Sequence, residues 1–106
     1  SVTTMKRRKV CQVCVLMIRP ALLVKCIRRI LHGKHVFKLN QCTNCHGKDG
    51  TSPFNLTTRR DSLSDDELRE FIKDPASFGN RRMPAFKTVI SENDLDALIF
   101  YLRTLP

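Results

Sequence analysis

The sequence lacks the features that would assign it to most enzyme classes. It contains no tryptophan, no internal repeat, no low-complexity tract and no alternating pattern typical of a β-strand. No Ser/His/Asp set, glycine-rich phosphate loop or pair of catalytic carboxylates is recognisable. At 106 residues the chain provides one small domain at most. A domain of this size gains stability from any large apolar group that it encloses.

Acidic residues are absent from the first 32 positions. This N-terminal arm carries eight of the 19 Lys and Arg residues, whereas residues 33–106 carry the other eleven and all ten acids. Eight of the nine net positive charges therefore belong to the arm, and the remainder of the chain is close to neutral, with a net charge of +1. Over the whole chain this charge would suggest a nucleic-acid partner. Because it is confined to residues 1–32, we expect no nucleic acid, but an arm that contacts an anionic membrane or a partner subunit.

An apolar run long enough to cross a membrane is also missing. Residues 10–18 are almost entirely apolar, but Arg19 and Lys25 interrupt the sequence before the roughly 20 apolar residues that a transmembrane helix needs. The basic residues 6–9 followed by this run have the outline of a signal peptide, although no small-residue cleavage site follows. Three roles therefore stay open for the arm: an anchor, a docking helix or an atypical targeting segment.

The second half of the arm has the pattern of a basic amphipathic helix. Pro20 suits the first turn of a helix, and Gly33 is well placed to end it. Between them, apolar and basic residues recur on opposite sides. The apolar side holds Leu22, Leu23, Cys26, Ile27, Ile30 and Leu31, and the basic side holds Lys25, Arg28, Arg29 and His32. Such a helix favours an interface with lipid or with another subunit.

Beyond Gly33 the sequence predicts three helices separated by loops. These helices cover residues 34–40, 64–73 and 91–103. The second begins at a capping box formed by Ser64 and Glu67. The third has acids in its first turn and Arg103 in its last. The sequence therefore predicts an all-α domain over residues 33–106.

Residues 42–46 carry the most specific motif of the chain, Cys-Thr-Asn-Cys-His. In a C-x-x-C-H pentapeptide, one helical turn brings two thiols to the same edge of a haem, where they add to its two vinyl groups, and the adjacent His reaches the iron. The motif predicts one haem c, bound covalently through Cys42 and Cys45 and ligated by His46. The alternatives are a coincidental match or a redox C-x-x-C pair that happens to precede a His.

The chain has five cysteines, an odd number, and three of them lie in the arm. One disulfide among Cys11, Cys14 and Cys26 would leave a free thiol. Cys11 and Cys14 have the C-x-x-C spacing, but no His follows, so they form no second haem site. A zinc site would need more ligands than Cys26 offers.

Further segments around the haem motif are typical of one family. They are Phe37 one turn before the first Cys, Gly47-Lys48-Asp49-Gly50 with Pro53 and Leu56 after the His, Met83-Pro84-Ala85-Phe86, and the closing run from Leu98 to Leu102. With these segments, residues 33–106 resemble a small class I cytochrome c wrapped around one haem. The short stretch from His46 to Met83 resembles the compact bacterial members of that family.

The resemblance implies roles for individual residues. It makes His46 the proximal iron ligand and the sulfur of Met83 the ligand on the opposite face. It also implies that the backbone carbonyl of Pro53 accepts a hydrogen bond from the other imidazole nitrogen of His46, which would fix the ring. Phe37 and Tyr101 are expected to meet where the first and last helices of the family cross.

Ligand chemistry agrees with Met83. A thioether is a soft, neutral ligand that favours ferrous iron, so a His/Met pair raises the reduction potential relative to two nitrogen ligands. Met5 and Met17 lie in the arm, which leaves Met83 as the methionine of the domain. The alternative is that Met83 packs in the core and that His32 or His35 is the distal ligand.

These expectations favour an electron carrier over an enzyme, because two axial ligands leave the iron no free coordination site. We expect redox donor and acceptor proteins, a respiratory or photosynthetic complex, and a membrane-associated location in the bacterial periplasm or the mitochondrial intermembrane space. Lys48, Arg81, Arg82 and Lys87 flank the haem-contacting segments and could bind an acidic partner, or be ordinary surface charge. The alternative function is a haem sensor or a peroxidase-like enzyme in which Met83 leaves the iron.

Overall fold

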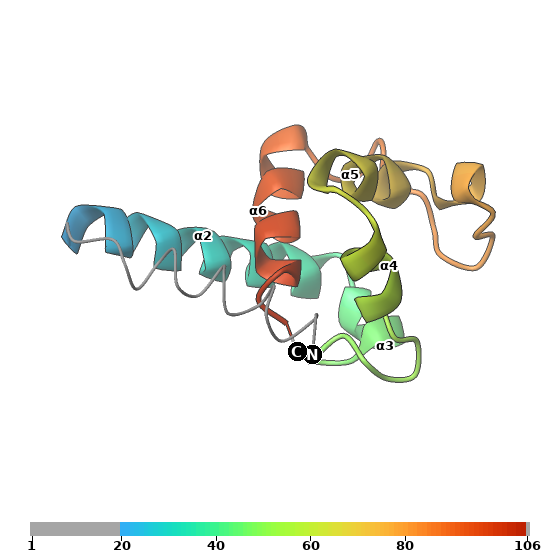
Figure 1. The fold of residues 1–106 in the computed structure, drawn as a ribbon, viewed down its shortest axis with the longest axis horizontal. Helices are drawn as coiled ribbons and strands as arrows, with labels where there is room; N and C mark the ends of the chain where they lie inside the picture. The colour runs from blue at the N-terminus through green and yellow to red at the C-terminus, as the bar shows by residue number, and fades with distance from the viewer. Residues whose placement is uncertain (1–19, 106) are drawn as a thin grey trace.

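The structure, a computed structural model, describes residues 20–105 of the chain (Figure 1). Within this range all regular structure is helical and no β-strand occurs, so the predicted all-α fold is confirmed. The helices are α2 (Pro20–Leu39), α3 (Cys42–His46), α4 (Thr57–Ser62), α5 (Asp65–Lys73), the 3-10 helix η1 (Pro75–Phe78) and α6 (Glu92–Leu102). The predictions for residues 1–19, including those for Cys11 and Cys14, lie outside the described residues.

Helix α2 runs unbroken through Gly33, so the predictions of a helix that ends there and of a separate helix over residues 34–40 were wrong. Gly33 is buried where α2 meets α6. A Cβ atom at this position would overlap the carbonyl of Ala97 and the Cβ of Tyr101. The glycine is therefore present for close helix packing, and this contact offsets the roughly 1 kcal/mol that Gly costs inside a helix.

The crossing of α2 and α6 forms the centre of the domain (Figure 1). The rings of Phe37 and Tyr101 meet edge to face there, with centroids 5.6 Å apart, which confirms the predicted aromatic contact. Burial raises the pKa of Tyr101, so its phenol stays neutral and acts as a packing group. The buried cluster around this contact comprises Val36, Leu68, Ile72, Ile90, Leu95, Leu98, Ile99, Leu102 and Leu105.

Helices α5 and α6 begin where the sequence predicted. Ser64 caps α5 by accepting a hydrogen bond from the Glu67 amide at 3.2 Å, and the Glu67 carboxylate accepts one from the Ser64 amide at 3.0 Å. This is the predicted capping box. Ser91 caps α6 by accepting one hydrogen bond, from the Asp94 amide. Arg103, expected in the last turn of α6, is its C-terminal cap.

Helix α4 was not predicted, because six residues are too few to show an apolar period. It begins after an Asn55 side chain that accepts hydrogen bonds from both the amide and the hydroxyl of Thr57, at 2.8 and 2.6 Å. Such a turn is a common local start for a helix. Its stability must come from contacts with the rest of the domain, since so short a helix is unstable alone.

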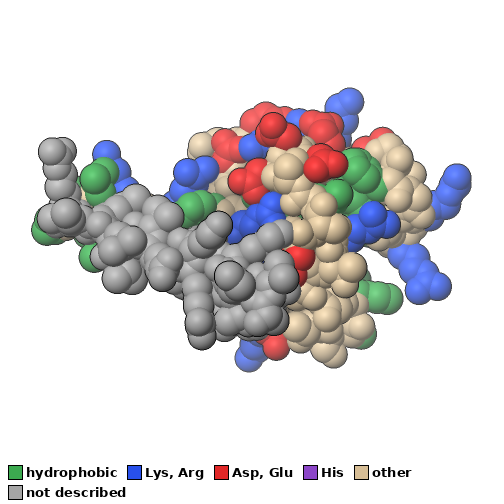
Figure 2. Space-filling model, in the orientation of Figure 1, with side chains coloured by type: hydrophobic (Ala, Val, Ile, Leu, Met, Phe, Trp, Pro, Cys, Tyr) green, Lys and Arg blue, Asp and Glu red, His purple; other side chains and the backbone are tan. Residues whose placement is uncertain are grey.

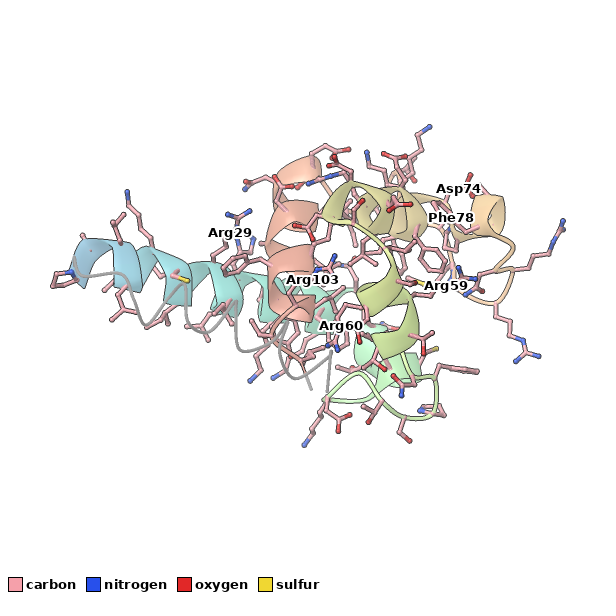
Figure 3. The ribbon with its side chains drawn as sticks, viewed as in Figure 1. Arg29, Arg59, Arg60, Asp74, Phe78 and Arg103 are labelled. Carbon is pink, nitrogen blue, oxygen red and sulfur yellow. The ribbon has the colours of Figure 1, made fainter. Side chains whose placement is uncertain are left out.

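Two arginines provide these contacts by capping each other's helices (Figure 3). Arg60, in α4 and 2 % exposed, donates to the carbonyls of Leu102 and Leu105 at 3.1 and 2.6 Å at the end of α6. Arg103, at the end of α6, donates to the Arg60 carbonyl and, at 2.8 Å, to that of Leu63 at the end of α4. Charged donors at carbonyl ends satisfy groups that a helix leaves without partners. This reciprocal cap fixes α4 against the end of α6.

Candidate haem site

The haem motif forms a short helix of its own. After α2 ends, Gln41 takes a left-handed conformation, with φ 60°, that reverses the chain into α3. Helix α3 then places the thiols of Cys42 and Cys45 and the imidazole of His46 on one continuous helical segment. The motif therefore has the helical turn that haem attachment requires.

The loop that follows α3 folds back and forms hydrogen bonds with that helix. Gly47 ends α3 with φ 71°, and its amide donates to the Thr43 carbonyl at 2.8 Å. A Cβ atom at Gly47 would lie 2.6 Å from the carbonyl oxygen of Ser52, so only glycine fits this turn. The amide of Phe54 then donates to the Cys45 carbonyl at 2.8 Å. The loop is thereby held against α3.

This loop supplies the hydrogen-bond partner of His46, but from a different residue than predicted. Nδ1 of His46 lies 2.7 Å from the carbonyl oxygen of Phe54, not from that of Pro53. The Phe54 amide bonds back to α3, which brings the carbonyl of the same residue to the imidazole. With the Nδ1 proton donated to this carbonyl, Nε2 keeps its lone pair for a metal ion. Pro53 lines the cavity beside it.

A cavity of about 590 Å³ adjoins the motif, within the roughly 300–1,000 Å³ of typical small-molecule sites. All five predicted site residues lie along it: Cys42, Cys45, His46, Pro53 and Met83. The rest of its lining is mainly apolar and includes Phe37, Leu68, Phe71, Ile72, Phe86 and Leu98. The structure therefore brings together every residue that the sequence predicted for one site.

The two thiols differ in their surroundings. Cys45 is exposed, whereas Cys42 is half-buried and packs against the core. Burial raises the pKa of Cys42 to about 11, and the neighbouring Cys45 adds to this rise. At neutral pH, Cys42 is therefore a neutral thiol and places no charge at the apolar wall. Both cysteines are free of disulfide bonds.

Met83 approaches the cavity from the loop between η1 and α6. It is half-buried, and it packs against the hydrophobic core. The amide of Phe86 donates to the Ile72 carbonyl at 3.2 Å, which ties the far side of this loop to α5. A thioether held in this way faces the same cavity as His46.

The alternative distal ligands do not reach this cavity. Nε2 of His32 lies 2.9 Å from Oδ1 of Asp94, at the first turn of α6. His35 is exposed on α2, and neither histidine is among the residues that line the cavity. The geometry therefore favours Met83 over both histidines.

Several polar residues of the cavity wall were not predicted. Arg59 lines the cavity and stacks over the ring of Phe71, with its guanidinium carbon 5.5 Å from the centroid. Arg60 and Asn80 also line it. Asn55 is a turn-forming residue shortly before the two arginines, and it is the one sequence signal that could have indicated them. Nothing in the sequence pattern distinguishes Asn80 from an ordinary loop residue.

The cavity fits a covalently held haem. It offers apolar walls for a flat macrocycle, two free thiols on one helix, an imidazole with its Nδ1 already bonded, and a thioether. The described residues contain no cluster of three or more His, Cys, Asp and Glu side chains suited to a bare metal ion. The imidazole of His46 and the thioether of Met83 would be suitable donors to the iron of such a haem.

A helical domain that sets a C-x-x-C-H helix against an apolar cavity has the arrangement of a c-type cytochrome. Comparison with known families agrees. The family described as cytochrome C oxidase, cbb3-type, subunit III matches residues 28–102. The chain belongs to this family, and it is a c-type cytochrome domain of the kind that takes part in electron transfer. A covalently bound haem c is therefore implied.

A curated relative points to the same class of protein. The chain is similar to "Cytochrome c oxidase subunit 2" of Alkalihalophilus pseudofirmus, with 37% identity over 86 residues. The match covers 69% of this chain and 25% of the relative, so the chain spans about a quarter of that protein's length. No solved structure matches the chain. Over residues 20–105, no helix has both the length and the hydrophobicity needed to cross a bilayer.

Proposed function

We propose that the chain carries single electrons through one haem c, attached at Cys42 and Cys45 and ligated by His46 and Met83. The observation that supports this most strongly is the convergence of these four residues on one apolar cavity. Haem bound there would supply a one-electron iron couple. If His46 and Met83 both bound the iron, no coordination site would be open to a substrate, and the domain would act as a carrier and not as an enzyme.

The residues of the site set the reduction potential. Phe54 fixes the orientation of the His46 ring through its carbonyl and makes the imidazole a better donor. The Met83 sulfur favours ferrous iron, and the largely apolar lining would lower the polarity around the haem. The thioether and the apolar lining raise the potential, as suits a carrier that delivers electrons to an oxidase, whereas the stronger imidazole donor acts in the opposite direction.

Covalent attachment is tested by extracting the protein. Acid-acetone treatment should leave the haem on the chain, and the haem should stay with the polypeptide in denaturing electrophoresis, because thioether bonds outlast unfolding. A protein that gives up all its haem to the solvent would contradict the proposal. A ferric spectrum with high-spin features would instead favour the competing function, a sensor or a peroxidase-like enzyme with a labile Met83.

The redox partners should meet the side of the domain that carries the cavity. The loops that carry Phe54 and Met83 also hold four exposed basic residues, namely Lys48, Arg81, Arg82 and Lys87. Acidic side chains gather instead over the first turns of α5 and α6 (Figure 2). A partner with an acidic surface would therefore be attracted to these loops and repelled by the acidic first turns of α5 and α6, in contacts that weaken with salt. We propose a subunit or soluble protein of a respiratory complex as this partner.

The arm is the second part of the proposal, and the structure changes its predicted apolar face. Ile30 packs against the core, so that part of the face points into the domain. Arg29, predicted on the polar side, stacks on the Phe100 ring at 4.9 Å. An outward stripe of Val24, Ile27 and Leu31 is left, with exposed fractions of 45, 46 and 57%.

This outward stripe suits an anionic membrane surface. All the charged side chains of α2 are basic, and its first turn holds no acid. Apolar burial together with about 1 kcal/mol per basic residue near anionic lipid would hold such a helix at an interface. We propose that the arm and the rest of α2 associate the domain with a membrane surface. This surface would face the bacterial periplasm or the mitochondrial intermembrane space.

Vesicle binding tests this association. The holoprotein should bind vesicles that contain phosphatidylglycerol, and the Ile27→Ser/Leu31→Ser variant should bind several-fold more weakly. The matched control is Leu39→Ser/Val89→Ser, which changes two residues that are more exposed but lie outside the stripe. Equal binding of both variants would contradict the proposal and leave a partner subunit or a targeting role for the arm.

A further inference from the structure

We infer that Asn80 is a positioning residue that holds Met83 in place as the distal ligand. The inference rests on the proposed His46/Met83 ligation and concerns how the chain fixes a ligand that no helix carries. His46 belongs to α3, whereas Met83 lies in a loop. A loop ligand needs another source of rigidity, because a ligand displaced by even 1 Å is a poor one.

Asn80 is itself anchored to the preceding helix. Gly79, with φ 84°, is the C-terminal cap of η1, and the Asn80 amide donates to the carbonyl of Pro75 at 3.0 Å. Pro75 is buried in the domain. Asn80 therefore starts the Met83 loop from a fixed point.

The side chain of Asn80 then determines where the loop goes. Its Oδ1 accepts hydrogen bonds from the backbone amides of Arg82 and Met83, at 3.0 and 3.1 Å. Residues 81–85 make no backbone–backbone hydrogen bond with any described residue. The next backbone anchor is the amide of Phe86 on the carbonyl of Ile72. Between these anchors, Asn80 alone among the described hydrogen-bond acceptors ties down the Met83 backbone.

The residue that holds the Met83 loop also lines the haem cavity. Asn80 is half-buried and lines the same cavity as Met83. Without the Oδ1 acceptor, the two amides would turn to water and the backbone at Met83 would lose its fixed distance from η1. The sulfur would then leave the iron more often, and an added ligand would compete more successfully. Two ordinary hydrogen bonds correspond to about a tenfold change in such an equilibrium.

The test is the cyanide affinity of the ferric holoprotein, read together with the long-wavelength Met-to-iron charge-transfer band. Asn80→Leu removes the acceptor at nearly constant size and should raise cyanide affinity about tenfold while weakening the band. Asn80→Asp keeps an oxygen in the same place and should behave like the unmodified protein. Asn93→Leu is the matched control, since Asn93 is exposed in the first turn of α6.

Unchanged cyanide affinity in Asn80→Leu would overturn the inference. If that variant fails to accumulate, Asn80→Ser decides the question, because its shorter hydroxyl reaches one amide at best. It should bind cyanide a few-fold more tightly, and an affinity equal to the unmodified protein would again overturn the inference.

Two further variants separate this inference from the proposed ligation. Met83→Ala should bind cyanide far more tightly, and adding Asn80→Leu to it should change nothing more, because Asn80 acts through Met83. Additive effects would mean that Asn80 acts otherwise, and the inference would fail while the ligation stands. If Met83→Ala leaves cyanide affinity unchanged, the ligation itself fails.

Discussion

The helical frame and the cavity wall of this domain are built by different means. The frame, α2, α5 and α6, is held by buried side chains, a capping box and a glycine contact at the helix crossing. The part of the cavity wall outside the frame consists of α3, α4 and the loops that carry Phe54 and Met83. It is held by hydrogen bonds to backbone carbonyls, by two arginines and by the Asn80 side chain. This part is called the wall below. The frame should therefore control stability, and the wall should control the chemistry of the haem.

The largest expected effect is on the wall. The double variant Cys42→Ala/Cys45→Ala should release haem completely on acid-acetone extraction, because no thioether bond can form. The measurement is the haem stain of the polypeptide after denaturing electrophoresis. Each single variant should keep one bond and most of its haem, and loss in only one of them would show unequal roles for the two thiols.

A change at Met83 should alter the chemistry and leave the frame intact. Met83→Ala should lower the midpoint potential and allow the ferrous protein to bind carbon monoxide, because the iron loses its thioether ligand. The measurements are a redox titration and the carbon monoxide difference spectrum. The far-ultraviolet circular dichroism spectrum should equal that of the unmodified protein, because the helices of the frame stay intact. An unchanged potential would reassign the distal ligand.

The opposite result is expected for the helix crossing. Gly33→Ala should lower the free energy of unfolding by roughly 1–3 kcal/mol, because the added Cβ meets the backbone of α6. The absorption spectrum of the molecules that remain folded should not change. Denaturant unfolding measures the loss, with Lys34→Ala as a control at the next, exposed position of α2. A shifted haem spectrum in Gly33→Ala would break the division between frame and wall.

The smallest effect belongs to an ion pair on the surface of the frame. The side chain of Lys73 lowers the pKa of Glu92, with Arg69 acting in the same direction. A lowered carboxyl pKa stabilises the fold above the ordinary value near 4.5, and this contribution is lost as the pH falls through the lower folded value. Glu92→Gln should therefore be slightly less stable at pH 7, and the difference should shrink below pH 4.5. If the stability difference between Glu92→Gln and the unmodified protein grew as the pH fell, the proposed direction of the pKa shift would be contradicted.

The frame could largely be predicted from the sequence because its signals are local. The Ser64–Glu67 capping box, the Ser91 cap and the aromatic pair at the crossing all follow from short patterns or from the family resemblance. Gly33 was misread because a helix-ending glycine and a helix-crossing glycine look alike in sequence. Only the position of α6 distinguishes the two.

For the wall, the sequence predicted which residues form the site but not all of the hydrogen bonds that hold them. Cys42, Cys45, His46 and Met83 follow from motif chemistry, and all four line one cavity. The carbonyl that accepts from His46 belongs to Phe54, one residue beyond the prediction, because backbone acceptors depend on loop geometry that side-chain types do not encode. The capping role of Arg60 and the two bonds from Asn80 depend on tertiary contacts of the same kind.

The ferric absorption spectrum of the purified holoprotein tests the central claim most directly. If His46 and Met83 ligate a haem held at Cys42 and Cys45, the spectrum should be low-spin and should contain the weak long-wavelength band of Met-to-iron charge transfer. That band should vanish in Met83→Ala and survive in His35→Ala. A high-spin spectrum without the band in the unmodified protein would contradict the claim that both axial positions are filled.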